Sequence, residues 1–468
     1  MTDLADPSAA ATDARAVALQ AACPGFVHLL GDPGYDAGRA GWNLAAQQRP
    51  AAVALPETVT QVSQVVRAAA RAGLRVAAQN TGHAAATLVA RGLGDVVLVR
   101  MGALSGVHVD PANQVARVEG GAVWSDVVAA AAPHGLTALH GSAPDVGVAG
   151  YTLGGGLSFY GRKHGLAASS VVGIELVDAS GEVVRADART NPDLFWAVRG
   201  GGGNFGIVTA LEFRLYPIAD VYAGMLLWDI GRADEVVAAW AAWCVTAPEE
   251  ITTSLRVMRF PPMPELPDFL RGRSLVVIDG AALLDDEEAE EQLAPLRALA
   301  PEMDTFSRVP AAAVTEMHMD PPAPVPAVGA GMMLARLDDA AVQAFLSVVG
   351  PEADTPLFIA ELRQLGGALG APASGGGALS HLVGSHAAML IAMAPTPEMA
   401  VAGEQAAGAV VEALAEWSEG RQFPNFAEQP IDTASVYQPD DWGRLRRIKA
   451  EVDPGRLFLA NHEIRGSH

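Results

Sequence analysis

The spacing of predicted strands and helices changes near residue 220, and this change restricts the fold more than any other feature. Residues 51–78 predict a strand, a helix with valines on one face, and a second strand. Short predicted strands continue to Pro217, including a hairpin at 171–185 that turns at a Ser-Gly pair. The first half of the chain therefore predicts a unit of mixed helices and short strands.

Beyond residue 220 the predicted strands are longer and alternate with helices. The predicted strands cover residues 221–228, 252–260, 274–283, 357–363 and 386–393. The predicted helices cover residues 233–244, 286–299, 397–417 and 440–452. This order predicts a second domain in which helices cover one side of an antiparallel sheet. The predicted fold class of the whole chain is α+β.

The composition excludes several classes of protein. The chain has 468 residues, a formal net charge of -22 and 50% hydrophobic residues, which is enough for a packed core and excludes a mainly disordered chain. The negative charge argues against nucleic acids and anionic membranes as partners, because both repel an acidic surface. The first residues are acidic, and no run approaches the ~20 apolar residues of a membrane span. We therefore expect a cytoplasmic protein, and the sequence carries no signal for its oligomeric state.

Three glycine-rich segments are candidates for a ligand site: residues 79–83 (QNTGH), 147–156 (GVAGYTLGGG) and 199–206 (RGGGGNFG). Glycines let backbone N–H groups approach a ligand closely, and consecutive N–H groups form concave anion sites. A diphosphate could be held in this way in a chain whose only lysines are Lys163 and Lys449. The segments do not fit the register of a dinucleotide-binding Rossmann fold. Walker loops, serine nucleophile elbows and zinc-binding helices are also missing from the sequence, so no metal site is predicted.

Several longer segments together resemble the FAD-linked oxidases of the vanillyl-alcohol oxidase superfamily, in particular the berberine-bridge-enzyme-like branch. The resemblance extends over about the whole chain. The segments LGGGLSFYGRKHGL and NPDLFWAVRGGGGNFGIVT match very specifically, and YDAGRAGWN, FPNF and RLRRIKAEVDPGRLF are similar to further family motifs. These five segments are residues 153–166, 191–209, 35–43, 423–426 and 444–458.

The resemblance implies a PCMH-type FAD-binding domain made of two α/β subdomains. This domain is expected at residues 1–218, with its core at about 46–218. A substrate domain with a large antiparallel sheet covered by helices is expected at 219–425. A berberine-like C-terminal segment at 426–468 is expected to return to the FAD domain.

The resemblance also implies how FAD is bound. In the family, the histidine at the position of His83 is linked covalently to the 8α-methyl group of the flavin, and neutral imidazole is a suitable nucleophile. The first arginine of the family motif is Gln79 here. Many relatives form a second bond through a cysteine, but the corresponding residue is Ala143, so a single covalent link is expected. The other expected FAD-binding residues are Asn80, Thr81, Gly82, Ala84, Gly141, Ser142, Val146, Gly147, Gly150, Gly154, Gly155, Gly156, Leu157, Gly206, Ile207, Val208, Asn425 and Asn461.

The expected activity is that of an FAD-dependent oxidoreductase, which moves a hydride from a small-molecule substrate to flavin N5. Val146 lies where family members control the access of oxygen, and its small side chain favours an oxidase over a dehydrogenase. Molecular oxygen would then take the electrons and give hydrogen peroxide. The composition of the second domain favours a largely apolar substrate of the secondary-metabolite type. The expected pocket residues are Phe423, Phe426, Met258 and His381.

The tyrosine base that is usual in the family is missing. Relatives carry a Y-x-N-Y motif, whereas this chain has FPNF, and the ring of Phe426 cannot take a proton. The other candidates for the base are Tyr437, Glu361, Tyr151 and His381. An ion pair with Arg363 is the more expected role of Glu361. A substrate that needs no base is a further alternative. So are non-redox, cyclase-like catalysis in a flavin-lined pocket and a flavin carrier without turnover.

Overall fold

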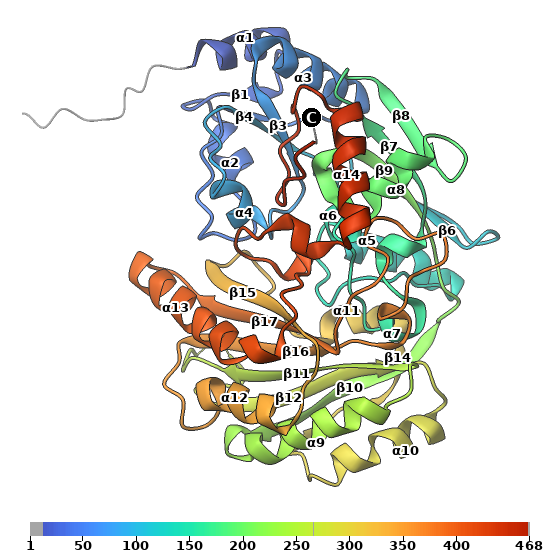
Figure 1. Ribbon diagram of the computed structural model, residues 1–468, viewed down its shortest axis with the longest axis vertical. Coiled ribbons are helices and arrows are strands. Elements are labelled where there is room, and N and C mark those ends of the chain that lie inside the picture. The colour runs from blue at the N-terminus through green and yellow to red at the C-terminus, as the bar shows by residue number, and fades with distance from the viewer. Residues whose placement is uncertain (1–12, 265, 467–468) are drawn as a thin grey trace, which may run out of the picture.

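The computed structural model describes residues 13–264 and 266–466, so the first twelve residues of the predicted first domain lie outside the described residues. Three sheets organise the chain (Figure 1). The first two sheets form the upper part of the molecule in that view, and the third forms the lower part with helices on its far side. The predicted α+β class is confirmed, because both helices and antiparallel sheets build the core.

The first sheet has four strands in the order β1-β2-β4-β3. Its strands are β1 (Val27–His28), β2 (Ala52–Ala54), β3 (Arg75–Gln79) and β4 (Val96–Arg100), and its helices are α1 (Ala14–Ala22), α2 (Tyr35–Arg39), α3 (Val59–Ala72) and α4 (Ala85–Val89). Helix α3 connects two strands that both run parallel to β4. The Thr58 hydroxyl caps its first turn by accepting from the Gln61 N–H, and Gly73 ends it at φ +70. The predicted β-α-β start is therefore confirmed.

The second sheet has five antiparallel strands in the order β5-β6-β9-β7-β8. The strands are β5 (Val107–Asp110), β6 (Val115–Glu119), β7 (Val171–Val177), β8 (Val183–Asp187) and β9 (Ile207–Arg214). The accompanying helices are α5 (Trp124–Ala131), α6 (Val148–Leu153), α7 (Gly161–His164) and α8 (Pro192–Gly201). The C-terminal helix α14 (Pro439–Val452) packs against α8, so the end of the chain returns to this sheet (Figure 1).

The third sheet has eight antiparallel strands, in the order β13-β10-β12-β11-β16-β17-β15 with β14 beside β10. The strands are β10 (Asp220–Asp229), β11 (Ile251–Arg259), β12 (Ser274–Ala282), β13 (Met303–Asp304), β14 (Ser307–Pro310), β15 (Ala327–Leu334), β16 (Leu357–Gln364) and β17 (His386–Met393). One face is covered by the apolar sides of α9 (Ala233–Thr246), α10 (Asp286–Arg297), α12 (Asp339–Val349) and α13 (Pro397–Ala413). The short helix α11 (Val314–Met317) lies between β14 and β15 in the chain. The opposite face is turned toward the first two sheets.

The structure contains two elements that the sequence did not predict. Strand β15 and helix α12 were not predicted, yet β15 pairs with β17 along its whole length. The change from the second to the third sheet falls between Arg214 and Asp220. Within the described residues, no helix is long and apolar enough to cross a lipid bilayer.

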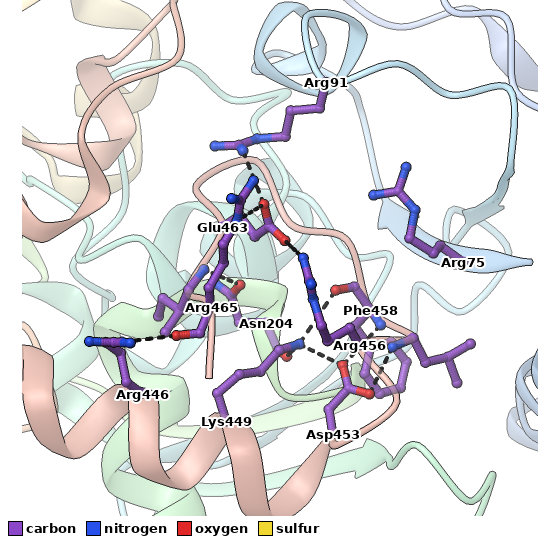
Figure 2. A network of polar contacts seen from close by, with 12 residues as sticks. Arg75, Arg91, Asn204, Arg446, Lys449, Asp453, Arg456, Phe458, Glu463 and Arg465 are labelled. Atoms are coloured by element: carbon purple, nitrogen blue, oxygen red, sulfur yellow. Dashed lines mark hydrogen bonds and ion pairs between the residues drawn. The ribbon is translucent and has the colours of Figure 1, made fainter. Parts of the chain in front are cut away.

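A buried polar network fixes the chain after α14 to the first two sheets (Figure 2). The Lys449 ammonium donates to the Asn204 carbonyl oxygen at 2.6 Å and to the Asp453 carboxylate. The same carboxylate accepts from the backbone N–H groups of Leu457 and Phe458, at 2.8 and 3.0 Å. Because Lys449 is only 3% exposed and Asp453 only 1%, each charge depends on the other for compensation.

Candidate functional site

A cavity of about 440 Å³ lies between the first two sheets and the uncovered face of the third. The three glycine-rich segments, far apart in the sequence, meet on its wall. The two segments 358–363 and 389–393 bring side chains from the third sheet. The residues predicted from sequence that line this cavity are Gln79, Asn80, Thr81, Gly82, His83, Ala84, Gly141, Ser142, Val146, Gly147, Gly150, Tyr151, Gly154, Leu157, Gly206, Val208, Glu361, Phe423, Asn425, Phe426, Tyr437 and Asn461.

Three of the predicted flavin-binding residues, Gly155, Gly156 and Ile207, do not line the cavity. Gly156 has φ +76, and a Cβ at this position would lie 2.6 Å from the Tyr151 ring. Gly155 has φ +117, and a Cβ there would lie 3.0 Å from the Phe423 ring. Ile207 is buried in the core beneath the first sheet. Glycine is therefore required at positions 155 and 156 by the backbone conformation and by the packing of aromatic rings, rather than by contact with a ligand.

Two of the predicted substrate-pocket residues also lie elsewhere. Met258 is 2% exposed and packs with Met225 and Leu270 in a separate apolar cluster. His381 lines a small neighbouring pocket together with Arg421. The pocket prediction is therefore corrected at these two residues, because Met258 is enclosed by apolar side chains farther along the sheet and His381 lies in a separate pocket.

His83 lies on the cavity wall beside an aromatic ring and a hydroxyl group. Its ring stacks on Trp42 with 4.4 Å between ring centroids, and its Nδ1 is 2.8 Å from the Thr81 hydroxyl. Its Nε2 is buried without a hydrogen-bond partner in the described part of the chain, and the nearest carboxylate oxygen, of Asp145, is 3.7 Å away. Burial lowers the pKa of the His83 imidazole. The ring is therefore held in the uncharged form that a nucleophile requires.

Gln79 is positioned by its neighbours rather than by a ligand. Its amide exchanges two hydrogen bonds with the Gln48 amide, at 2.9 and 3.0 Å. The Arg100 guanidinium also donates to the Gln79 side-chain oxygen at 2.9 Å. Arg100 therefore supplies a cation beside the position where the family motif has its first arginine.

The cavity wall has polar atoms without partners and stretches of uncovered backbone, both of which a ligand such as FAD can use. The His83 Nε2 is one buried nitrogen without a partner, and the Nδ1 of His462 is another on the same wall. Because His462 Nε2 contacts the Pro424 carbonyl oxygen at 3.0 Å, its Nδ1 is left as an acceptor for a ligand donor. A Cβ at Gly150 or Gly202 would meet nothing within 4 Å, so the backbone there is open to the cavity. These residues fit a bulky ligand with hydrogen-bond donors and anionic groups, as FAD is.

A network of charged side chains lies on the third-sheet side of the cavity. Arg363 donates two hydrogen bonds to Glu361 Oε1, at 2.6 and 2.8 Å, as the sequence predicts. The His318 Nδ1 is 2.7 Å from Asp279 Oδ2, and its Nε2 is 3.8 Å from Glu361 Oε1. Burial raises the pKa of the Asp279 carboxyl, but the paired Arg256 and His318 outweigh burial and hold this pKa well below its usual range. All five side chains are less than 5% exposed.

Three further titratable groups line the same cavity. The Tyr437 hydroxyl donates to the Gly200 carbonyl oxygen at 2.8 Å, and burial raises the pKa of this phenol. The Tyr151 hydroxyl is buried, and its pKa is raised by the same cause. Glu428 follows the FPNF segment, and burial raises the pKa of its carboxyl to about 7. Of these three groups, only Glu428 changes its charge near neutral pH.

The remaining wall is apolar. Phe423 and Phe426 contact each other edge to face, with 5.2 Å between ring centroids. Alternate residues of β17 face them across the cavity, because successive side chains of a strand point to opposite sides of the sheet. These residues are Met389, Ile391 and Met393. A largely apolar ligand with a few polar groups fits this combination of walls.

The sequence arguments missed several residues that the structure brings to the cavity. His318 lies between Met317 and Met319, and neither His318 nor Asp279 belongs to one of the motifs described above. A signal existed at Asp279, because a single acid inside an apolar strand (LVVIDGAAL) must find a partner when the strand is buried. Glu428 and Asp320 lie in loops, where the sequence offers no comparable signal.

His386, at the start of β17, lies outside the cavity on the helix-covered face of the sheet, 5.2 Å from the Trp240 ring centroid. Burial lowers the pKa of His386 to about 3, whereas an unfolded histidine takes a proton near pH ~6.5. Its stabilising contribution is therefore complete above pH ~6.5 and is lost as the pH falls. Between pH 7 and 5 this single residue is expected to reduce the free energy of unfolding by about 2 kcal/mol.

The variant His386→Phe is expected to lack this share of the pH dependence. Urea unfolding at pH 7 and at pH 5 should therefore differ less in the variant than in the parent protein. The matched control is His108→Gln, because His108 is exposed on β5 and its replacement should keep the parent's full difference. An identical pH dependence in His386→Phe and the parent would contradict the assignment.

Comparison with known proteins agrees with this site. Residues 50–187 match the FAD binding domain family. The (R)-6-hydroxynicotine oxidase of Paenarthrobacter nicotinovorans is 37% identical over 198 residues, which is 42% of this chain and 43% of that protein. The chitooligosaccharide oxidase of Gibberella zeae is 32% identical over 259 residues, 54% of this chain and 50% of that protein. The sequence matches thus span half or less of these curated relatives.

Solved structures resemble the whole fold. The BBE-like 1 protein of Physcomitrella patens superposes with a TM-score of 0.83 over 97% of this chain and 99% of that chain, at 22% identity. The 6-hydroxy-D-nicotine oxidase of Arthrobacter nicotinovorans gives a TM-score of 0.80 over 94% and 97%, at 24% identity. The glycine-lined cavity thus lies in a chain that has the fold of these proteins and that matches the FAD binding domain family over residues 50–187. The match over residues 50–187 and the shared fold agree with the resemblance of the sequence motifs to the berberine-bridge-enzyme-like branch of the vanillyl-alcohol oxidase superfamily.

Proposed function

We propose that this protein is an FAD-dependent oxidase that acts on a largely apolar small molecule of the secondary-metabolite type. The proposal rests on one continuous cavity, which extends from His83 to the charged network on the third-sheet side. The chemistry supplied by bound FAD is the acceptance of a hydride and the transfer of two electrons to oxygen, which gives hydrogen peroxide. Val146 lines the same cavity, and its small side chain leaves room for oxygen.

We infer one covalent link between the protein and FAD, through His83. The neutral imidazole and its unpartnered Nε2 support this role. Ala143 also lines the cavity, and its methyl side chain offers no thiol for a second link.

The substrate class is inferred from the cavity wall. Methionine, isoleucine and phenylalanine side chains favour an apolar body, and the polar network favours one hydrogen-bonding group. Among the four bases that the sequence offers, the phenols of Tyr437 and Tyr151 are poor proton acceptors at neutral pH, and His381 lies outside the main cavity. Glu361 is the best of the four because Arg363 occupies only its Oε1. The non-redox alternative is less favoured, since these polar groups suit oxidation of a donor-bearing substrate and the curated relatives carry oxidase names.

The proposal is tested by adding substrates to the purified holoprotein without oxygen. The panel contains cyclic amines, secondary alcohols and oligosaccharides, with (R)-6-hydroxynicotine and xylobiose as its first members. We expect at least one amine or alcohol to bleach the visible flavin band, and air to restore the band with release of about one hydrogen peroxide per flavin.

Dithionite provides the control, because it reduces a bound flavin whether or not a substrate is recognised. Full bleaching by dithionite without bleaching by any panel member would contradict the oxidoreductase and favour a non-redox catalyst or a carrier. Bleaching by substrate without peroxide release on aeration would indicate a dehydrogenase.

A further inference from the structure

The network of charged side chains on the third-sheet side of the cavity has five buried members, and the charges of four of them cancel. Arg256 and Arg363 contribute two positive charges, and Asp279 and Glu361 contribute two negative charges. His318 is the fifth member and is 3% exposed. The two ion pairs of these four side chains cancel in charge, so they are compensated without a charge on the His318 imidazole.

The position of the proton on His318 follows from its partner. An ionised carboxylate only accepts hydrogen bonds, so the contact of 2.7 Å between His318 Nδ1 and Asp279 places the proton on Nδ1. Asp279 is itself held by the Ser254 hydroxyl and the Arg256 guanidinium. The Nε2 of the neutral ring then carries a lone pair.

This lone pair lies beside a second acceptor on the cavity wall. Nε2 is 3.8 Å from Glu361 Oε1, which is too far for a hydrogen bond, and both residues line the cavity. Neither atom can donate to the other, and Oε1 already accepts from Arg363, so the Nε2 lone pair is left for a ligand that brings an O–H or N–H group. A carboxylate that orients an imidazole, with the other ring nitrogen facing a substrate, is a recurrent arrangement for general bases.

The network also lies beside the residue that replaces the missing tyrosine. The Arg363 guanidinium is 5.5 Å from the centroid of the Phe426 ring, and the His318 ring centroid is 6.0 Å from that of Phe159. Phe159 in turn lies 5.3 Å from the same guanidinium. The network that contains His318 therefore lies next to the part of the cavity that Phe426 borders.

We propose that His318 is the proton acceptor for the substrate O–H or N–H group, positioned by Asp279, with Glu361 as a second acceptor for the same group; this role rests on the proposed oxidase function. The substrate O–H or N–H bond breaks and its proton goes to Nε2. The adjacent carbon loses a hydride to the electron acceptor named above, and the product is a carbonyl or an imine. The substrate is thus a secondary or primary alcohol, or an amine with at least one N–H.

The first test needs no substrate. In holoprotein labelled with ¹⁵N-histidine, the signals of His318 are identified by their disappearance in His318→Asn, whose amide can still donate to Asp279. At pH 7.5 we expect one protonated nitrogen, Nδ1, and one unprotonated nitrogen, Nε2. A ring protonated on Nε2, or on both nitrogens, would overturn the proposal, because no lone pair would then face the cavity.

The second test uses the panel compound that bleaches the parent protein, beginning with (R)-6-hydroxynicotine. In His318→Asn we expect the anaerobic bleaching rate to fall by about 10²–10⁴-fold. The pH dependence that a deprotonated base gives to the parent's rate should also be lost in this variant. The charged groups around His318, with which the pH profile must be compared, are Asp279, Arg256, Glu361, Arg363 and Asp320. An unchanged rate and pH profile would overturn the proposal.

Two controls separate this role from damage to the protein. Bleaching by dithionite and the flavin spectrum should be the same in His318→Asn and the parent, because His318 is not expected to hold the cofactor. His134→Asn, at an exposed position, should keep the parent's rate with substrate. If no panel compound bleaches the parent, the proposed oxidase function fails, while the ¹⁵N measurement still decides the state of His318.

Discussion

Replacing His83 with alanine is expected to release the flavin into solution when the protein is precipitated with acid, whereas the parent protein should form a yellow pellet. The side chain combines a neutral imidazole, an unpartnered Nε2 and a position on the cavity wall. Only a covalent bond survives the unfolding of the cavity, so the expected change is from nearly complete retention of flavin to nearly none. The measurement is flavin absorbance in the pellet and the supernatant.

The matched control for this experiment is His108→Ala, which removes an imidazole from the exposed strand β5 and should leave the pellet yellow. Peptide mapping of the parent should find one flavin-bearing peptide, and it should contain residue 83. Flavin in the supernatant of the parent protein would refute the covalent link while leaving non-covalent FAD binding intact. A second flavin-bearing peptide would contradict the inference from Ala143.

The cofactor half of the site was predictable because its chemistry is local in the sequence. His83 and the glycines of residues 147–150 lie in short segments whose residue types are dictated by backbone approach to a ligand, and those segments do line the cavity. The prediction failed at Gly155 and Gly156 for a physical reason. A glycine needed for positive φ and for the packing of a tyrosine ring looks the same in the sequence as a glycine that contacts a ligand.

The substrate half was less predictable because it depends on contacts between distant strands. Asp279 and His318 come together only after β12 takes its place in the third sheet, and His318 lies in an irregular segment after α11. Strand β15, with the sequence AVGAGMML, has two glycines and one β-branched residue, so neither periodicity nor β-propensity reveals it. Pairing with β17 supplies the hydrogen bonds that make it a strand.

Removal of the Lys449 ammonium, in the variant Lys449→Met, is expected to lower the free energy of unfolding by about 3–5 kcal/mol. The substitution leaves the Asp453 carboxylate buried without its cation and the Asn204 carbonyl oxygen without a donor (Figure 2). Since domains are stable by only about 5–15 kcal/mol, this is a large part of the total. Urea unfolding followed by tryptophan fluorescence measures the change.

The only other lysine of the chain provides the control. Lys163 pairs with Glu249 and Glu250 at the surface, where its side chain is 37% exposed, so Lys163→Met should change the unfolding free energy by no more than about 1 kcal/mol. The damage at Lys449 should also reach the cofactor, because the same network holds the chain that leads to Asn461 and His462 on the cavity wall. We therefore expect the flavin to be more exposed to solvent in Lys449→Met. Iodide should quench flavin fluorescence faster in this variant, whereas Lys163→Met should match the parent. Equal stability of the two variants would show that the buried pair does not anchor the C-terminal segment.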